Sequence, residues 1–214
     1  MLVVRSESLD VQSRLSQLGL VEQVLVDAVA RGNMRRQECT PNHPACFIGL
    51  EAWGWTVCYL REGLVPKAWT RREEGNWPLT VHPSKRMAIA VATGDENTGN
   101  PNATPMTKSP KGPNTVQAIA KNHLQTSLFD DWMLPDQTGE DKDDCLTWLL
   151  LISTQKGKVR CELSLPVTCN GKVDGWKERI ILRELEIDPE PSVTPLPLLP
   201  EQPDIDVPLL RRTS

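Results

Sequence analysis

The sequence lacks most of what nucleophilic enzymes use. It has three histidines among 214 residues, and no serine lies in a glycine-flanked nucleophile elbow. Neither standard glycine-rich phosphate loop is present. A nuclease core with Glu-x-Lys on a strand is also missing, since Glu162 is followed by a leucine and a serine. These absences favour a non-catalytic role, and we predict no catalytic residue.

Long apolar runs are absent as well. No stretch approaches the roughly 18 residues that a membrane helix needs, and the first residues do not read as a secretory signal. We therefore expect a cytoplasmic protein without a membrane contact, whose six cysteines are free thiols. The spacing of Cys39, His43, Cys46 and Cys58 contains no close C-x2-C pair, so no metal site is predicted.

Charge is unevenly distributed. The net charge of −4 argues against a generic nucleic-acid coat, which is normally basic. Residues 1–128 carry 14 basic and 11 acidic side chains, a net of +3, whereas residues 129–214 carry 10 and 17, a net of −7. Such an imbalance is common surface variation, but it also allows the N-terminal part to meet an anionic partner.

Hydrophobic periodicity predicts helices and strands in a fixed order. Apolar residues at steps of three and four predict helices over 9–31 and 47–64, with Gly19 weakening the first. A hairpin follows over 79–82 and 86–92, with bulky residues on one face of its second strand and Ala88, Ala90 and Ala92 on the other. This pattern predicts that both faces are covered, the small one by a helix. A short helix is expected over 115–123.

A meander of strands closes the pattern. Strands are predicted over 145–154, 158–166 and 177–187, with a turn at Asn170-Gly171. Alternation predicts that Val159 and Cys161 face the core while Arg160, Glu162 and Ser164 face outward. The fold class is therefore α+β: an antiparallel sheet of about five strands packed against two to three helices, with a disordered proline-rich C-terminal tail.

Composition changes after this meander. Seven of the 18 prolines fall within residues 188–214, which predicts an extended segment. We therefore divide the chain into a single α+β domain, 1–187, and a tail, 188–214. The apolar and proline-rich residues of 189–214 would suit a groove on a protein partner, although an unbound solubilising tail explains them equally well.

The first candidate site is the loop over residues 94–114, GDENTGNPNATPMTKSPKGPN. A loop of about 20 residues is rare inside a compact domain unless it has a function. Paired carboxylates could hold Mg²⁺, and lysines with backbone N–H groups could hold phosphate. The predicted ligand- or phosphate-binding residues are Asp95, Glu96, Thr98, Lys108 and Lys111. The competing interpretation is a surface loop shaped by its glycines and prolines.

The second candidate site is a predicted loop that interleaves tryptophans with basic residues over 61–77. Cations can meet phosphates while indoles stack on bases. The predicted nucleic-acid-binding residues are Arg61, Lys67, Trp69, Arg71, Arg72 and Trp77. The competing interpretation is that the tryptophans pack inward and the arginines are merely solvated.

Three segments also resemble a known group of proteins. REGL at 61–64 with Trp69, AIAVATGDENTG at 88–99 and TKSPKGPNT at 107–115 resemble uncharacterised bacterial proteins of mobile or phage-related loci, a family with no known activity. The resemblance covers about half of the chain. It implies a bacterial cytoplasmic accessory protein and assigns no catalytic residue.

Three functional hypotheses follow. The first is a non-catalytic binding or accessory protein acting within a bacterial or phage-related cytoplasmic assembly, and hence a protein partner. The second is a metal-dependent nucleotide- or nucleic-acid-processing enzyme that uses the 94–114 loop, with Mg²⁺ as its cofactor. The third is a nucleic-acid-binding protein that uses the 61–77 segment. The first hypothesis requires no cofactor.

Overall fold

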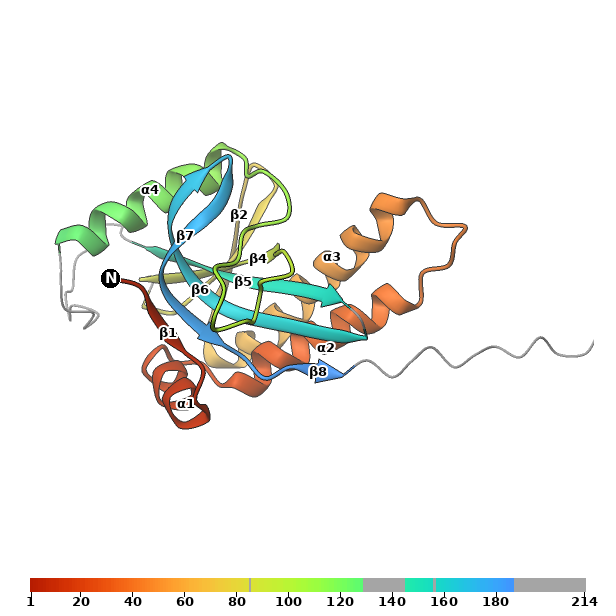
Figure 1. Ribbon diagram of the computed structural model, residues 1–214, viewed down its shortest axis with the longest axis horizontal. Coiled ribbons are helices and arrows are strands. Elements are labelled where there is room, and N and C mark those ends of the chain that lie inside the picture. Colours follow the sequence, from red (N-terminus) through yellow and green to blue (C-terminus); the bar gives the residue numbers. More distant parts are fainter. Residues whose placement is uncertain (85, 129–144, 156, 187–214) are drawn as a thin grey trace, which may run out of the picture.

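The computed structural model describes residues 1–84, 86–128, 145–155 and 157–186. One sheet organises this part of the chain (Figure 1), with the strand order β1-β7-β6-β5-β4-β3-β2 and with β8 paired to β6. The strands are β1 (Val3–Arg5), β2 (Thr70–Glu74), β3 (Trp77–Val81), β4 (Met87–Thr93), β5 (Leu146–Gln155), β6 (Lys158–Asn170), β7 (Lys172–Ile181) and β8 (Leu185–Glu186).

Helices cover both faces of the sheet. The helices α1 (Ser8–Gln17), α2 (Glu22–Gln37) and α3 (Ala45–Leu64) share one hydrophobic core with the bulky residues of β4. The helix α4 (Pro113–Leu128) packs on the opposite face, where its Ile119 joins Ala88, Ala90 and Ala92 in a second core. The division of β4 into a bulky and a small face is therefore confirmed, and so is the α+β class.

The sheet is mixed, so the predicted antiparallel sheet of about five strands was wrong. β4 pairs with β5 in parallel, and β1 pairs with β7 in parallel. Parallel neighbours need a long crossover, and the segment between β4 and β5 contains both the long loop and α4. The two predicted hairpins are present as β3–β4 and β6–β7, the second turning at Asn170 and Gly171.

The predicted helix over 9–31 is two helices. Gly19 has φ +68°, and the N–H groups of Gly19 and Leu20 donate to the carbonyls of Ser16 and Leu15. This is the Schellman arrangement that ends a helix at a left-handed residue. A side chain in this conformation would be strained, so glycine stops α1 here and does not merely weaken a longer helix.

The predicted outward face of β6 is buried at two of its three residues, whereas the Arg160 side chain is 43% exposed, as predicted. Val159 and Cys161 do face the core, as predicted, but Glu162 and Ser164 on the other side are fully buried. The cover comes from the long loop, whose Gly99 N–H contacts Glu162. Alternation along one strand shows which face is polar, but not whether that face is exposed. Here the polar face is covered by other polar groups, which supply its hydrogen bonds.

The cysteines agree with the sequence prediction, whereas the segment 70–74 does not. All six cysteines are free thiols, as predicted, and no helix in the described ranges is long and apolar enough to cross a membrane. The segment 70–74, expected as part of a loop, is strand β2. The tail, 188–214, lies outside the described residues.

Candidate functional site

The long loop does not project from the scaffold but lies against the sheet. Beyond β4 the chain runs out and returns, so that Gly94 bridges to Thr107. The Lys108 N–H then donates to the Thr93 carbonyl at 2.9 Å, and the Lys111 N–H donates to the Gly171 carbonyl at 2.8 Å. The returning half is thus fixed to strand β4 and to the β6–β7 turn by its backbone.

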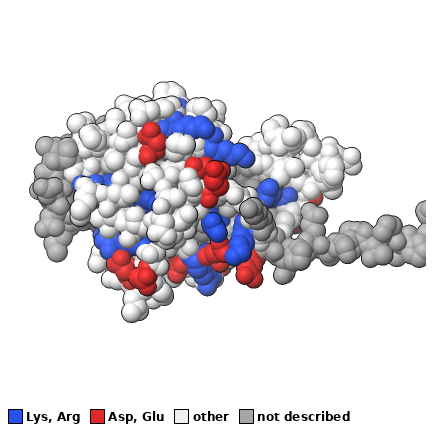
Figure 2. All heavy atoms as spheres, in the orientation of Figure 1, with Lys and Arg blue, Asp and Glu red and all other residues white. Residues whose placement is uncertain are grey.

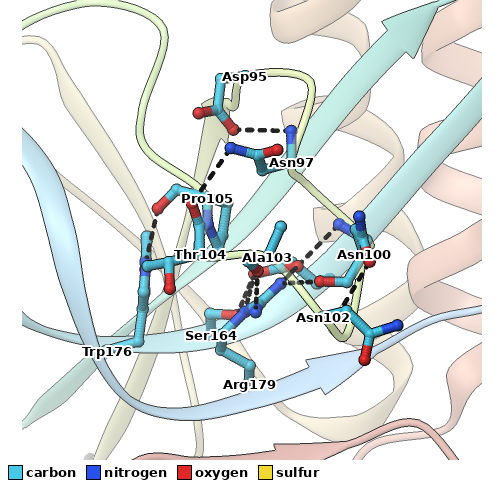
Figure 3. A network of polar contacts seen from close by, with 12 residues as sticks. Asp95, Asn97, Asn100, Asn102, Ala103, Thr104, Pro105, Ser164, Trp176 and Arg179 are labelled. Carbon is cyan, nitrogen blue, oxygen red and sulfur yellow. Dashed lines mark hydrogen bonds and ion pairs between the residues drawn. The ribbon is translucent and has the colours of Figure 1, made fainter.

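A buried ion pair holds the outgoing half (Figure 3). Arg179 on β7 donates from Nε and Nη2 to the Glu162 carboxylate on β6, at 3.0 and 2.7 Å. The same guanidinium donates to the carbonyls of Ala103 and Asn100 in the loop, at 2.7 and 3.1 Å. Gly99 N–H completes the contact with Glu162 at 2.8 Å. Both charged side chains therefore hold the loop in place through hydrogen bonds to its backbone.

The predicted ligand-binding residues separate within this loop. The Asp95 carboxylate accepts the Asn97 N–H at 3.1 Å, a turn-forming contact, and Glu96 is exposed. Thr98 is fully buried, and its hydroxyl has no partner among the described residues. Lys108 is exposed, whereas Lys111 is half-buried. No hydrogen bond or ion pair among the described residues joins either acid to either lysine.

A magnesium site finds no further support here. No group of three or more acidic, histidine or cysteine side chains that could hold a metal occurs in the described residues. Asp95 and Glu96 are adjacent in sequence, but one is engaged in a turn and the other faces solvent. Mg²⁺ keeps several waters when it is bound by one or two carboxylates, so the magnesium hypothesis stays a prediction.

The 61–77 segment is folded differently from the predicted loop. Trp69 is buried and packs edge-on against His82, with ring centroids 4.9 Å apart. Arg61 forms an ion pair with Glu73 at 2.8 Å and also donates to the Leu79 carbonyl. An indole in the core cannot stack on a base, so Trp69 drops out of the predicted nucleic-acid surface.

The remaining residues of that set divide between solvent and the sheet. Lys67 and Arg71 are exposed, while Arg72 is half-buried on β2, opposite Leu79. Trp77 begins β3 and is half-buried. On the face seen in Figure 2, basic and acidic side chains lie interspersed, with no continuous basic stripe across that face.

A cavity opens where the sheet separates between β3 and β4. These strands pair only at Thr80–Ile89 and Val81–Ala88. Further along β4, the Val91 carbonyl accepts the indole N–H of Trp53 at 3.0 Å. The resulting cavity has a volume of about 230 Å³. Its walls are formed by Trp53, Asn76, Trp77, Pro78, Ala90, Val91, Ala92, Lys111, Thr115 and Leu149.

Among the described residues that line this cavity, Lys111 is the one with a charged side chain. Burial lowers its pKa from the ordinary lysine value because the ammonium loses hydrating water, while the nearby Cys169 acts in the opposite direction. No carboxylate forms an ion pair with Lys111 in the part of the chain that the structure describes. Lys111 therefore contributes to the cavity wall a basic residue that no described carboxylate pairs with.

A second feature is the overhang of α3, which we define as residues 45–51. Leu64, Leu60 and Val57 are buried on one face of the helix. The same spacing of three and four continues to Leu50, which is 59% exposed. Figure 1 shows why: the α2–α3 connection extends past the ends of the strands, so the sheet no longer lies beneath this stripe.

The two tryptophans of α3 have different roles. Sequence spacing indicates that they cannot share one buried stripe. Trp53 points to the sheet, whereas Trp55 stacks on Tyr59, with centroids 5.4 Å apart, and lies under Arg35 at 4.6 Å. Trp55 therefore packs within the hairpin that α2 and α3 form.

Sequence reasoning missed several residues that shape these sites. Glu162 was predicted to face outward, and Arg179 lies in a predicted strand but was assigned no role. Trp53 was not predicted to contact the sheet. A signal for the first pair existed, since an acid and a base of opposite charge lie on adjacent predicted strands. Comparison with known protein families, with curated proteins and with solved structures found no match for this chain.

Proposed function

We propose that this protein is a non-catalytic binding or accessory protein, and that a protein partner packs its own apolar segment on the overhang of α3. The single observation that carries this proposal is the continuation of the buried stripe of α3 beyond the sheet. Leu50 occupies a core-facing position of an amphipathic helix without a core beneath it.

Burial of this stripe would be favourable. Removing apolar area from water contributes about 25 cal/mol per Å², and Phe47 and Ile48 next to Leu50 are only partly buried. Exposed leucines scattered singly are ordinary. The distinction here is that Leu50 extends a stripe of helix residues whose other members are in the core, and Figure 2 shows few charges at this end of the molecule.

The test uses Leu50→Glu and a matched control. Leu9 on α1 is 84% exposed, so Leu9→Glu makes the same chemical change away from the overhang. We expect affinity-tagged wild-type protein and the control to retain a partner in native extracts, and to bind it again after both are purified. Leu50→Glu should lose at least tenfold in affinity. A wild-type chain that stays solitary, or equal binding by both variants, contradicts the proposal.

The two alternatives remain predictions with their own measurements. For the metal-dependent enzyme, Mg²⁺ with a nucleotide should raise the melting temperature, and Asp95→Ala should abolish the rise. For nucleic-acid binding, affinity should fall steeply with salt, and the exposed Lys67 and Arg71 are the residues to substitute. The tail proposed as a partner-binding segment, 189–214, lies outside the described residues.

A further inference from the structure

The cavity between β3 and β4 has the features of a ligand site that is separate from the overhang of α3. It exists because two neighbouring strands stop pairing after two residue pairs. Pro78 on β3 has no backbone N–H to offer a neighbouring strand. Two carbonyls of β4 accept hydrogen bonds from groups outside β3: the Val91 carbonyl from the Trp53 indole N–H, and the Thr93 carbonyl from the Lys108 N–H. The opening therefore leaves neither of these two carbonyls without a hydrogen-bond donor.

The walls of the cavity combine a large apolar part with a few polar groups. Two indoles, a proline and small aliphatic residues supply most of the lining, and Lys111, Thr115 and Asn76 supply the polar groups. Aromatic and apolar walls bind a planar apolar body, while a few placed polar groups orient it. Thr115 lies in the first turn of α4, where the helix dipole adds to the positive potential that Lys111 creates.

The size of the cavity limits the ligand. A cavity of about 150 Å³ is known to accommodate benzene, and drug-sized ligands occupy about 300–1,000 Å³. The volume here, about 230 Å³, lies between these two values. It suits one ring with a short charged substituent and is too small for a nucleotide.

We propose that this cavity binds a small planar carboxylate, with the ring between the Trp53 and Trp77 walls and the carboxylate on the Lys111 ammonium. Lys111 has its backbone fixed to Gly171, which limits how far the side chain can withdraw. Because the ammonium is already short of water, part of its desolvation has occurred before a ligand arrives. A carboxylate would restore the lost stabilisation of the charge.

Benzoate and phenylacetate are the probes, and benzamide is the neutral isostere. Intrinsic tryptophan fluorescence and calorimetry on the full chain would report binding, since both indoles line the cavity. We expect saturable benzoate binding with a Kd of about 1 mM or tighter, and at least tenfold weaker binding of benzamide. No saturation by either carboxylate up to about 10 mM would overturn the proposal.

Two lysine variants separate the site from general charge. Lys111→Met should weaken benzoate binding at least tenfold, whereas Lys108→Met should leave it unchanged because Lys108 is exposed and does not line the cavity. Equal effects of the two substitutions would refute the role of Lys111. If Lys111→Met impairs folding, the pH profile decides: benzoate affinity should fall as the pH rises through the lowered pKa of Lys111, below the ordinary value of 10.5. A flat profile up to that value would overturn the proposal.

Discussion

Replacing Arg179 by methionine should destabilise the protein strongly. Arg179 and Glu162 are 1% and 0% exposed, and the guanidinium makes two hydrogen bonds to the carboxylate and two to loop carbonyls. Without it, the hydrogen bonds that Glu162 keeps among the described residues are those from the Gly99 N–H and the Ser164 hydroxyl. Removing one member of a buried ion pair costs about 3–5 kcal/mol, because the other charge is left uncompensated.

The loop carbonyls change this figure little. Asn100 and Ala103 are only partly buried, so a loosened loop can turn their carbonyls toward water. We therefore expect a loss of about 4 kcal/mol in the free energy of unfolding. For a chain of this size, 1 kcal/mol shifts Tm by about 2–4 °C, so the variant should melt about 8–16 °C lower.

Urea denaturation followed by far-UV circular dichroism measures this loss, and Lys158→Met is the control. Lys158 forms an exposed ion pair with Glu184, and such pairs contribute at most about 1 kcal/mol. The double variant Glu162→Gln, Arg179→Met should cost less than the sum of its single variants, since no buried charge remains. The reasoning fails if Arg179→Met costs no more than the control, or if the two single losses simply add.

Three further outcomes are expected. Cys161 is fully buried, and burial raises its pKa to about 12, so alkylation followed by mass spectrometry should label exposed Cys46 first and Cys161 only after unfolding; early labelling of Cys161 would contradict the described core. Gly19→Ala should cost about 1–2 kcal/mol in thermal or urea unfolding, because the residue has φ +68° and a Cβ would lie 2.9 Å from Nε2 of His82. Asn122→Ala should cost about 2–3 kcal/mol in the same assay, since this buried amide makes three hydrogen bonds that join α4 to the sheet, and a neutral result would mean that water replaces them.

Local sequence patterns predicted most helices and strands, but not which distant segments pack over them. The β6–β7 turn at Asn170 and Gly171 and the two faces of β4 were readable because the relevant residues lie within a few positions of one another. The burial of Glu162 was not, because its cover comes from Gly99, 63 residues earlier. The parallel pairing of β4 with β5 depends likewise on the route of the chain between them, which periodicity within a strand does not encode.

The candidate sites show the same limit. Lys111 and Trp77 were assigned to different sites, one for phosphate and one for nucleic acid, because they belong to separate stretches of sequence. In the structure they line one cavity. What joins them is the point at which β3 and β4 cease to pair, and this is a property of strand pairing that no single motif carries.

The length of the 94–114 loop supported the hypothesis that the whole loop serves a function, but its two halves have different explanations. The outgoing half is accounted for by Arg179, which needs loop carbonyls to satisfy a guanidinium that one carboxylate leaves partly unpaired. Buried polar groups must find such partners, so a long, irregular segment over this pair is a structural requirement. The same requirement does not extend to Lys111, which is one of the residues that line the cavity and whose backbone alone makes the contact with Gly171. A cation placed in a largely apolar cavity weakens the fold slightly through its desolvation. Because the fold bears this cost without an evident structural return, ligand binding is the better explanation for Lys111. The same argument does not apply to Asp95 and Glu96.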